Sequence, residues 1–305
     1  MSEDKRIWYK SPVVTAPVLV IFVLTALSLS RFVLLRQQES QSNIFLVISV
    51  IQISVLILPG ALYYLAKGRR LSSPMFISPI RASHIIFIIF TLLLFISGTI
   101  LIKYIYIVTN NQITALSGYF DSVVAQADQA SNVGIILSLI VIPAISEEIL
   151  FRGILLSEYR TMGSVNAVVM SAICFSMLHL SMSNFPIYFF TGIVLGFVTV
   201  ITRSLLAPIL LHLISNFLSI YGSDLFLRVT IQKSGAFFVG FVIIMIFSLS
   251  LLFVVSKLEQ IYFSYADNPP IESLPQKSIR NLPKVFLSPS FLVLLVVYII
   301  VTVIT

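Results

Sequence analysis

The chain has little charge and almost no cysteine. Charged residues make up 10% of its 305 residues, whereas a soluble domain carries about 25%. So few charges cannot cover a water-facing surface, which excludes an ordinary soluble globular protein. The single cysteine, Cys174, excludes an intrachain disulfide, and a free cysteine within an apolar stretch usually packs as a small hydrophobe.

The chain also lacks a continuous basic face. Its formal net charge is +7, but the lysines and arginines stand at the ends of apolar runs. Charge in that position sets the orientation of membrane helices. We therefore expect no nucleic-acid partner and a lipid bilayer as the surroundings of the chain.

Long apolar runs are what the sequence has in abundance, since 58% of the residues are hydrophobic. A run of 18 or more apolar residues is typical of a membrane-spanning helix, and these runs are too long and continuous for barrel strands. The sequence predicts an all-α, polytopic bundle of transmembrane helices with about 8–9 spans. The nine candidate spans cover residues 12–35, 43–66, 83–107, 134–156, 164–180, 184–202, 204–222, 235–256 and 286–305.

The first run resembles a signal peptide, because Lys5, Arg6 and Lys10 precede it, but it continues to Leu35. We expect an uncleaved first span. With the N-terminus in the cytoplasm, 14 of the 19 lysines and arginines fall on the inner side and 5 on the outer side, as the positive-inside rule favours. We expect a multi-pass protein of a bacterial cell membrane, because the compact chain carries no eukaryotic targeting signal.

The chain forms one membrane domain in three parts. Residues 1–133 hold N-terminal membrane helices and a polar outer loop, residues 134–222 hold a helical core, and residues 223–305 hold C-terminal membrane helices. A short amphipathic element is expected at 119–130, within the polar outer stretch 109–133. The proline-containing stretch 263–285 is expected to be irregular.

The fourth predicted span contains three charged residues, Glu147, Glu148 and Arg152. Charges inside a membrane span are costly, so they indicate a functional site. Glu148 and Arg152 are four residues apart and can pair on one helix face, while Glu147 projects about 100° away. Apolar surroundings disfavour its charged form, which suits a general base. A structural ion pair that joins two helices would explain the same residues.

Two further pairs with helical spacing follow, Phe175 with His179 and His212 with Asn216. Members of a pair four residues apart point the same way. One histidine in a membrane helix is most often a hydrogen-bond partner of another helix. Two histidines, an asparagine and an unpaired glutamate within four consecutive spans favour a shared site.

Spacing gives a geometric argument for that site. The turn between the fourth and fifth spans centres near Gly163, with Glu147 16 residues before it and His179 16 residues after it. In an antiparallel hairpin these positions lie at the same depth and could hold one water. Pro143 stands four residues before Glu147, and Pro208 stands four residues before His212. A proline within a helix can kink it and leave one backbone carbonyl without its hydrogen bond.

The three motifs together resemble the CPBP family, which includes the CAAX prenyl proteases of the Rce1 type and bacterial Abi-type proteins. The family pattern is Glu-Glu-x-x-x-Arg, Phe-x-x-x-His and His-x-x-x-Asn or Asp, each on a membrane helix. The corresponding residues are Glu147, Glu148, Arg152, Phe175, His179, His212 and Asn216. The resemblance covers residues 134–222, and the other helices match only in being hydrophobic.

The resemblance implies a glutamate-dependent intramembrane endopeptidase. Glu147 and His179 would activate a water, and His212 and Asn216 would stabilise the oxyanion. Glu148 and Arg152 would orient the site. The substrate would be a prenylated CAAX protein or a bacterial peptide precursor.

Many relatives are regarded as metalloproteases, so zinc is an alternative. Glu147, His179 and His212 could supply three ligands with an open fourth position, but no His-Glu-x-x-His motif is present. We favour a mechanism without a cofactor.

Two other functions stay open. The chain could be a non-catalytic membrane regulator or bacteriocin-immunity protein of the same family, although the intact Glu147, His179, His212 and Asn216 argue against a decayed site. A transporter could use buried charges as a proton relay, but no inverted repeat supports one.

Overall fold

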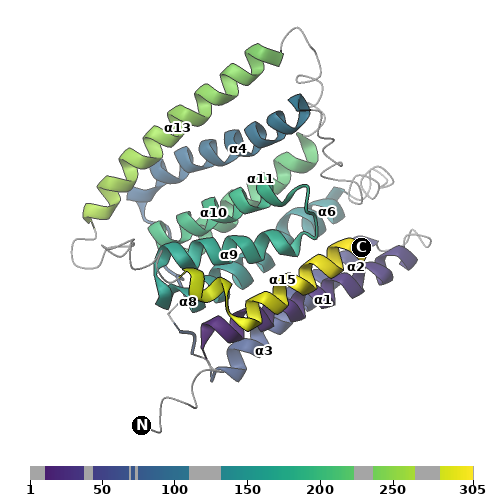
Figure 1. The fold of residues 1–305 in the computed structure, drawn as a ribbon. Helices are drawn as coiled ribbons and strands as arrows, with labels where there is room; N and C mark the ends of the chain where they lie inside the picture. Colours follow the sequence, from purple (N-terminus) through teal and green to yellow (C-terminus); the bar gives the residue numbers. More distant parts are fainter. Residues whose placement is uncertain are drawn as a thin grey trace.

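The computed structural model describes residues 11–37, 44–68, 70–72, 75–109, 132–222, 236–264 and 282–304. All regular elements in these ranges are helical, and the only extended pairing is an isolated bridge between Ile77 and Ser204. The predicted element at 119–130 and most of the stretch 263–285 lie outside the described residues. The helices run roughly alongside one another in a broad layer (Figure 1).

The first third of the chain forms three continuous helices. The first is α1 (Pro12–Gln37), and the second joins α2 (Ile44–Gln52), the π-helical turn η4 (Ile53–Ile57) and α3 (Leu58–Ala66). The third opens with the 3₁₀ turn η5 (Ala82–His84) and continues as α4 (Ile85–Val108).

The central part begins with one long, distorted helix that changes its hydrogen-bond pattern several times. Its pieces are α6 (Asn132–Ile135), η7 (Ile136–Val141), α7 (Ile142–Glu148), η8 (Ile149–Leu155), α8 (Leu156–Tyr159) and η9 (Arg160–Met162). Then follow α9 (Ser164–Leu178), α10 (Phe185–Thr202) and α11 (Leu206–Tyr221), and the chain closes with α13 (Ala236–Ser264) and α15 (Pro289–Ile304).

Each of the nine predicted apolar segments is mainly helical over its described residues, which confirms the all-α, polytopic fold class. Six of these helices are long and apolar enough to cross a membrane. The other three, α9, α11 and α15, have 15, 16 and 16 residues. At 1.5 Å per residue they extend about 22–24 Å, less than the roughly 30 Å hydrocarbon thickness.

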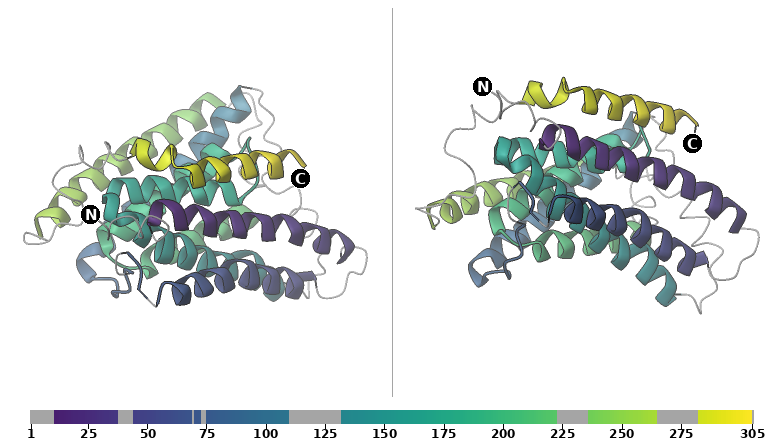
Figure 2. Two further views of the ribbon diagram at one scale, coloured as in Figure 1. Left: turned by 60° about the horizontal axis from the view of Figure 1, so that its bottom comes forward. Right: turned by 90° about the horizontal axis from the view of Figure 1, so that it is seen from below.

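The helices pack around two main cores. The larger core gathers side chains of α1, the helix 132–162, α9 and α15, and the second core gathers side chains of α4, α10, α11 and α13. Figures 1 and 2 show α1 beside α15 at one edge and α4 beside α13 at the other. The pairs α9–α10 and α10–α4 connect the two edges, so α9 and α10 lie between them.

The fourth helix ends later than predicted, at Met162 rather than 156. The extension carries Glu158, whose fully buried carboxylate accepts hydrogen bonds from Lys67 Nζ at 2.7 Å and from Ser72. A buried carboxylate is tolerated when it is paired in this way. The helix thus continues beyond its apolar run, and these hydrogen bonds attach Lys67 and Ser72, which follow α3, to it.

Candidate active site

The two adjacent glutamates lie in a short α-helical stretch between two π-helical ones. α7 contains Glu147 and Glu148, with η7 before it and η8 directly after it. Pro143 is the second residue of α7 and has no N–H to donate, which accounts for the irregular hydrogen bonding at this point. π-Helical turns are found frequently at functional sites, and here they lie directly before and after the helical stretch that contains the two glutamates.

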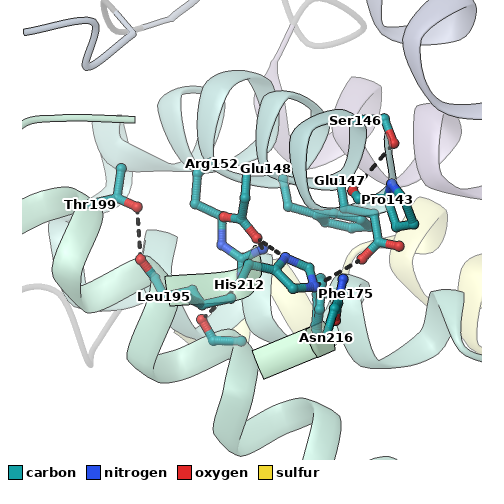
Figure 3. Close-up of polar contacts among 12 residues, drawn as sticks. Pro143, Ser146, Glu147, Glu148, Arg152, Phe175, Leu195, Thr199, His212 and Asn216 are labelled. Carbon is teal, nitrogen blue, oxygen red and sulfur yellow. Dashed lines mark hydrogen bonds and ion pairs between the residues drawn. The ribbon is translucent and has the colours of Figure 1, made fainter. Parts of the chain in front are cut away.

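Glu148 connects two helices through one oxygen. Its Oε1 accepts a hydrogen bond from Arg152 Nη1 at 2.8 Å, as the spacing of four predicts, and lies 2.7 Å from His212 Nδ1 on α11 (Figure 3). Glu148 and Arg152 are fully buried. Because a carboxylate oxygen is an acceptor, Nδ1 of His212 carries the hydrogen. The other nitrogen, Nε2, is directed away from Glu148.

Glu147 faces the other side of the same imidazole. Its Oε2 lies 3.9 Å from His212 Nε2, and its side chain is 12% exposed (Figure 3). This separation is too long for a direct hydrogen bond. Glu147 Oε2 has no hydrogen-bond partner within the described part of the chain. The sequence expectation that the two glutamates point in different directions therefore agrees with the geometry.

Arg152 is held from three sides. Besides Glu148, it donates from Nη2 to the carbonyl oxygen of Gly192 on α10 at 3.3 Å, and its guanidinium lies 4.6 Å from the centre of the Phe175 ring. A cation over an aromatic face is attracted by the ring quadrupole. The guanidinium thus links the glutamate helix to α9 and α10 in the interior of the molecule.

Phe175 lies between the two imidazoles. Its ring centre is 4.9 Å from that of His179 and 5.8 Å from that of His212. His179 is the C-cap of α9, and its Nδ1 lies 3.0 Å from the carbonyl oxygen of Phe175. The carbonyl can only accept, so Nδ1 donates and Nε2 is the nitrogen with a free lone pair. The described contacts include no direct bond between His179 and Glu147.

His179 directly follows the short helix α9. From the turn at Gly163 the helix rises about 22 Å and ends at Leu178, and residues 179–184 are irregular. Irregular backbone at membrane depth is tolerated where it is buried in protein or lines a water-filled cavity. His179 is half-buried at the end of its helix, whereas His212 is buried within α11.

Asn216 lies one turn beyond His212 on α11, and Figure 3 shows both side chains near Glu147. Its Nδ2 donates a weak hydrogen bond of 3.4 Å to the carbonyl oxygen of Ile140. Pro208 is the third residue of α11, where the backbone N–H would have no partner within the helix in any case. At this position Pro208 removes no hydrogen bond from within α11.

The zinc alternative requires Glu147, His179 and His212 to surround one point. Among the residues that the structure describes, no three histidine, cysteine or acidic side chains are arranged to hold a metal ion. His212 Nδ1 and His179 Nδ1 are already bonded to Glu148 and to a backbone carbonyl. These bonds leave Nε2 of both rings available, but within the described part of the chain Glu147, His179 and His212 do not surround one point, and no step below uses a metal.

Three contacts were not predicted from the sequence. His212 binds Glu148, the carbonyl of Gly192 binds Arg152, and the ring of Tyr188 stacks on His179. The spacing of Gly192 and Gly196, four residues apart on a membrane helix, is a signal for close helix packing. No comparable signal in the sequence points to Tyr188 or to the His212–Glu148 bond.

Comparison with protein families gives one match. Residues 129–218 match the family described as type II CAAX prenyl endopeptidase Rce1-like. The matched residues contain all three motifs, from Glu147 to Asn216. No curated protein and no solved structure matches the chain. The match supports the resemblance to the CPBP family over this segment, and the apolar helices support an integral, multi-pass membrane protein.

Proposed function

We propose that this chain, whose residues 129–218 carry the Rce1-like segment of the CPBP family, is an endopeptidase that hydrolyses a peptide bond inside the membrane with Glu147 as the base. The family match supports a protease of the CAAX type at the level of the family. The substrate, the mechanism and the roles of the residues are our proposals.

The position of Glu147 is the observation that carries this proposal. Its carboxylate lies near the middle of the helix 132–162, 3.9 Å from His212 Nε2, and Oε2 has no hydrogen-bond partner within the described residues. A buried carboxylate that served only stability would be expected to be bonded through at least one oxygen, as Glu158 and Glu148 are, although Glu148 Oε2 also has no partner within the described residues. Glu147 is therefore better suited to accept a proton from a water during a reaction.

Glu147 and His179 take part in the proposed steps of the reaction. A water held by Glu147, with Nε2 of His179 as a second acceptor, attacks the carbonyl carbon of the scissile bond. Its proton moves to the Glu147 carboxylate. When the tetrahedral intermediate collapses, the C–N bond breaks, and Glu147 returns the proton to the leaving nitrogen.

The carbonyl oxygen becomes negative during the attack and needs donors. With His212 in its charged form, Nε2–H would be one donor and Asn216 Nδ2 the other. Glu148 supports the positive imidazole through its 2.7 Å contact with Nδ1. Arg152 in turn compensates the charge of Glu148, so that the charges of the buried group nearly balance.

A prenylated peptide with a CAAX-type C-terminus is the substrate that the family description favours. A lipid-modified C-terminus would be held in the bilayer, at the depth of the site. A bacterial peptide precursor is the second substrate to test, because the same chemistry would hydrolyse it.

The first test replaces Glu147 by Gln in purified protein reconstituted into lipid vesicles, with farnesylated CAAX peptide and a membrane-bound peptide precursor as substrates. We expect kcat to fall by about 10²–10⁴-fold, because an amide cannot accept the proton. Glu158→Gln is the matched control, since it removes a buried carboxylate from the same helix away from the site. The control should retain kcat even where it unfolds at a lower temperature.

The second test concerns the oxyanion. Asn216→Ala should lower kcat by about 10²–10³-fold with little change in KM, because the donor acts on the transition state. Asn166→Ala is the control. Asn166 is a buried asparagine in the first turn of α9, and its side chain donates a hydrogen bond to the Met162 carbonyl.

The outcome that contradicts the proposal is clear. If wild-type protein cleaves neither substrate, or if Glu147→Gln, His179→Ala and His212→Ala all keep the biological role at normal membrane levels, the chain acts as a non-catalytic membrane regulator.

A further inference from the structure

We infer that Tyr188 is a positioning residue that fixes the imidazole of His179, an inference that rests on the proposed peptidase function. The two rings are stacked, with centroids 3.5 Å apart and an angle of 18° between their planes. Aromatic pairs in proteins usually have centroids about 4.5–7 Å apart. The contact is therefore unusually close and nearly parallel, and Tyr188 covers one whole face of the imidazole.

His179 is restrained in three independent ways. The Phe175 carbonyl holds Nδ1 at 3.0 Å, the Phe175 ring contacts the imidazole at a tilt of 59°, and Tyr188 covers its face. The hydrogen bond alone leaves the ring free to swing about the N–H direction. The stack removes that freedom. Only the in-plane approach to Nε2 then stays open to a water.

The stack also connects two helices where the backbone between them is irregular. α9 ends at Leu178, Leu180 has a left-handed φ of 48°, and α10 starts at Phe185. Tyr188 lies in the first turn of α10, where its backbone N–H bonds to the Asn184 carbonyl. His179 lies beyond the regular part of its own helix, so the helix alone does not hold it. Tyr188 supplies the missing support from the next helix.

Tyr188 is connected to the side of the site where the base lies through ring contacts. The ring of Phe175 contacts both His179, on which Tyr188 stacks, and His212, whose Nε2 lies 3.9 Å from Glu147. An imidazole that tilted away from Tyr188 would move Nε2 relative to Glu147. A displacement of about 1 Å is enough to cost about 10²-fold in rate.

The test compares Tyr188→Phe, which keeps the ring, with Tyr188→Leu, which removes it. We expect Tyr188→Phe to keep kcat within about threefold of wild type. Tyr188→Leu should lower kcat by about 10–10²-fold with KM within about twofold, because the substrate does not bind His179 in the ground state. Phe189→Leu is the control, since this neighbouring α10 aromatic stacks on Phe185 and not on a histidine.

A spectroscopic signature separates positioning from general stability. The chain has three histidines, so ¹³C-labelled histidine gives three ring signals, and the His179→Ala variant assigns one of them. The ring current of Tyr188 should shift the His179 ring protons upfield in wild type and in Tyr188→Phe. The shift should be lost in Tyr188→Leu and kept in Phe189→Leu.

Two results would overturn the inference. One is a Tyr188→Leu protein with wild-type kcat, and the other is a Tyr188→Phe protein as impaired as Tyr188→Leu, since the hydroxyl and not the ring would then matter. Glu147→Gln separates this failure from that of the proposed function. If Glu147→Gln abolishes cleavage and Tyr188→Leu does not affect it, the peptidase stands and the role of Tyr188 is wrong.

Discussion

Arg152 shows how much one buried side chain supports. It is fully buried and contacts Glu148, the Gly192 carbonyl and the Phe175 ring. Replacing Arg152 by Met leaves Glu148 buried without its cation, a change that typically costs about 3–5 kcal/mol. We expect a large drop in the unfolding midpoint, measured by denaturation in mixed micelles, together with loss of cleavage.

The double variant Glu148→Gln with Arg152→Met serves as the control for this prediction. It removes both charges, so that no unpaired ion stays in the interior, and removing a whole buried pair is often nearly neutral. It should recover much of the lost stability and none of the lost kcat, because His212 loses its carboxylate partner. A double variant as unstable as Arg152→Met alone would mean that packing, and not charge, explains the effect.

Residue patterns in the sequence predict contacts within one helix much better than contacts between helices. The spacing of four between Glu148 and Arg152 predicts their pairing, because helix geometry alone brings them together. The bond from His212 to Glu148 and the stack of Tyr188 on His179 depend on the tilt and rotation of separate helices. These are set by packing over the whole bundle, and no local spacing encodes them.

At the scale of elements, the close contact of α9 and α10 brings the Gly192 carbonyl to Arg152. A Cβ on Gly192 would lie 2.7 Å from Cα and 3.2 Å from the carbonyl oxygen of Ala172, so one helix would have to shift. Gly192→Ala should lower stability by about 1–3 kcal/mol through overpacking. It should also lower kcat, because the shift stretches the bond to Arg152.

Gly196→Ala is the matched control, one turn along the same helix. Its Cβ would meet mainly a side-chain methyl of Val168 at 3.2 Å, which can move a few tenths of an ångström. Replacing a helix-interior glycine also gains up to about 1 kcal/mol in helix propensity. Thermal unfolding and kcat of the two variants, measured together, should differ clearly. Equal behaviour would show that the α9–α10 contact does not control the site.

The hydrophobicity of the sequence predicts where the helices lie, but it does not predict where their hydrogen-bond pattern changes or where they end. All nine apolar segments appear as helices near their predicted positions because burial in a bilayer requires continuous apolar runs. The extension of that helix to Met162 carries Glu158, whose partner Lys67 is distant in sequence, and no spacing in the sequence predicts the π-helical turns on either side of α7. Periodicity carries no information about such partners.

At the scale of the whole molecule, the two cores place the site between the edge helices. α1 and α15 close one side, and Ser290 Oγ on α15 donates to the Val13 carbonyl at 2.8 Å. α4 and α13 close the other side, and α13 presents large side chains such as Phe238 and Leu252 on its surface. An apolar outer surface of this kind suits contact with lipid, and the polar residues are kept for the interior.

The orientation in the membrane is the last property that charge predicts, and cysteine labelling tests it. Cys174 is the only cysteine and is fully buried, so wild-type protein should not react with a membrane-impermeant maleimide. Thr161 and Thr109 are exposed near opposite ends of the helices 132–162 and 82–109. A cysteine at either position would therefore give a specific signal.

With the N-terminus in the cytoplasm, Thr109→Cys should label in intact cells, and Thr161→Cys should label only in inside-out vesicles. The physical reason is the excess of lysine and arginine on the loops that share a side with Thr161, among them Lys67, Arg81 and Arg160, since such loops stay on the cytoplasmic side. The reverse pattern would place Gly163 and Arg203 outside, and residues 179–184, at the far end of α9, would then lie nearer the cytoplasmic side. A substrate would in that case reach His179 from the opposite side of the membrane, which makes the labelling pattern a test of substrate access as well as of topology.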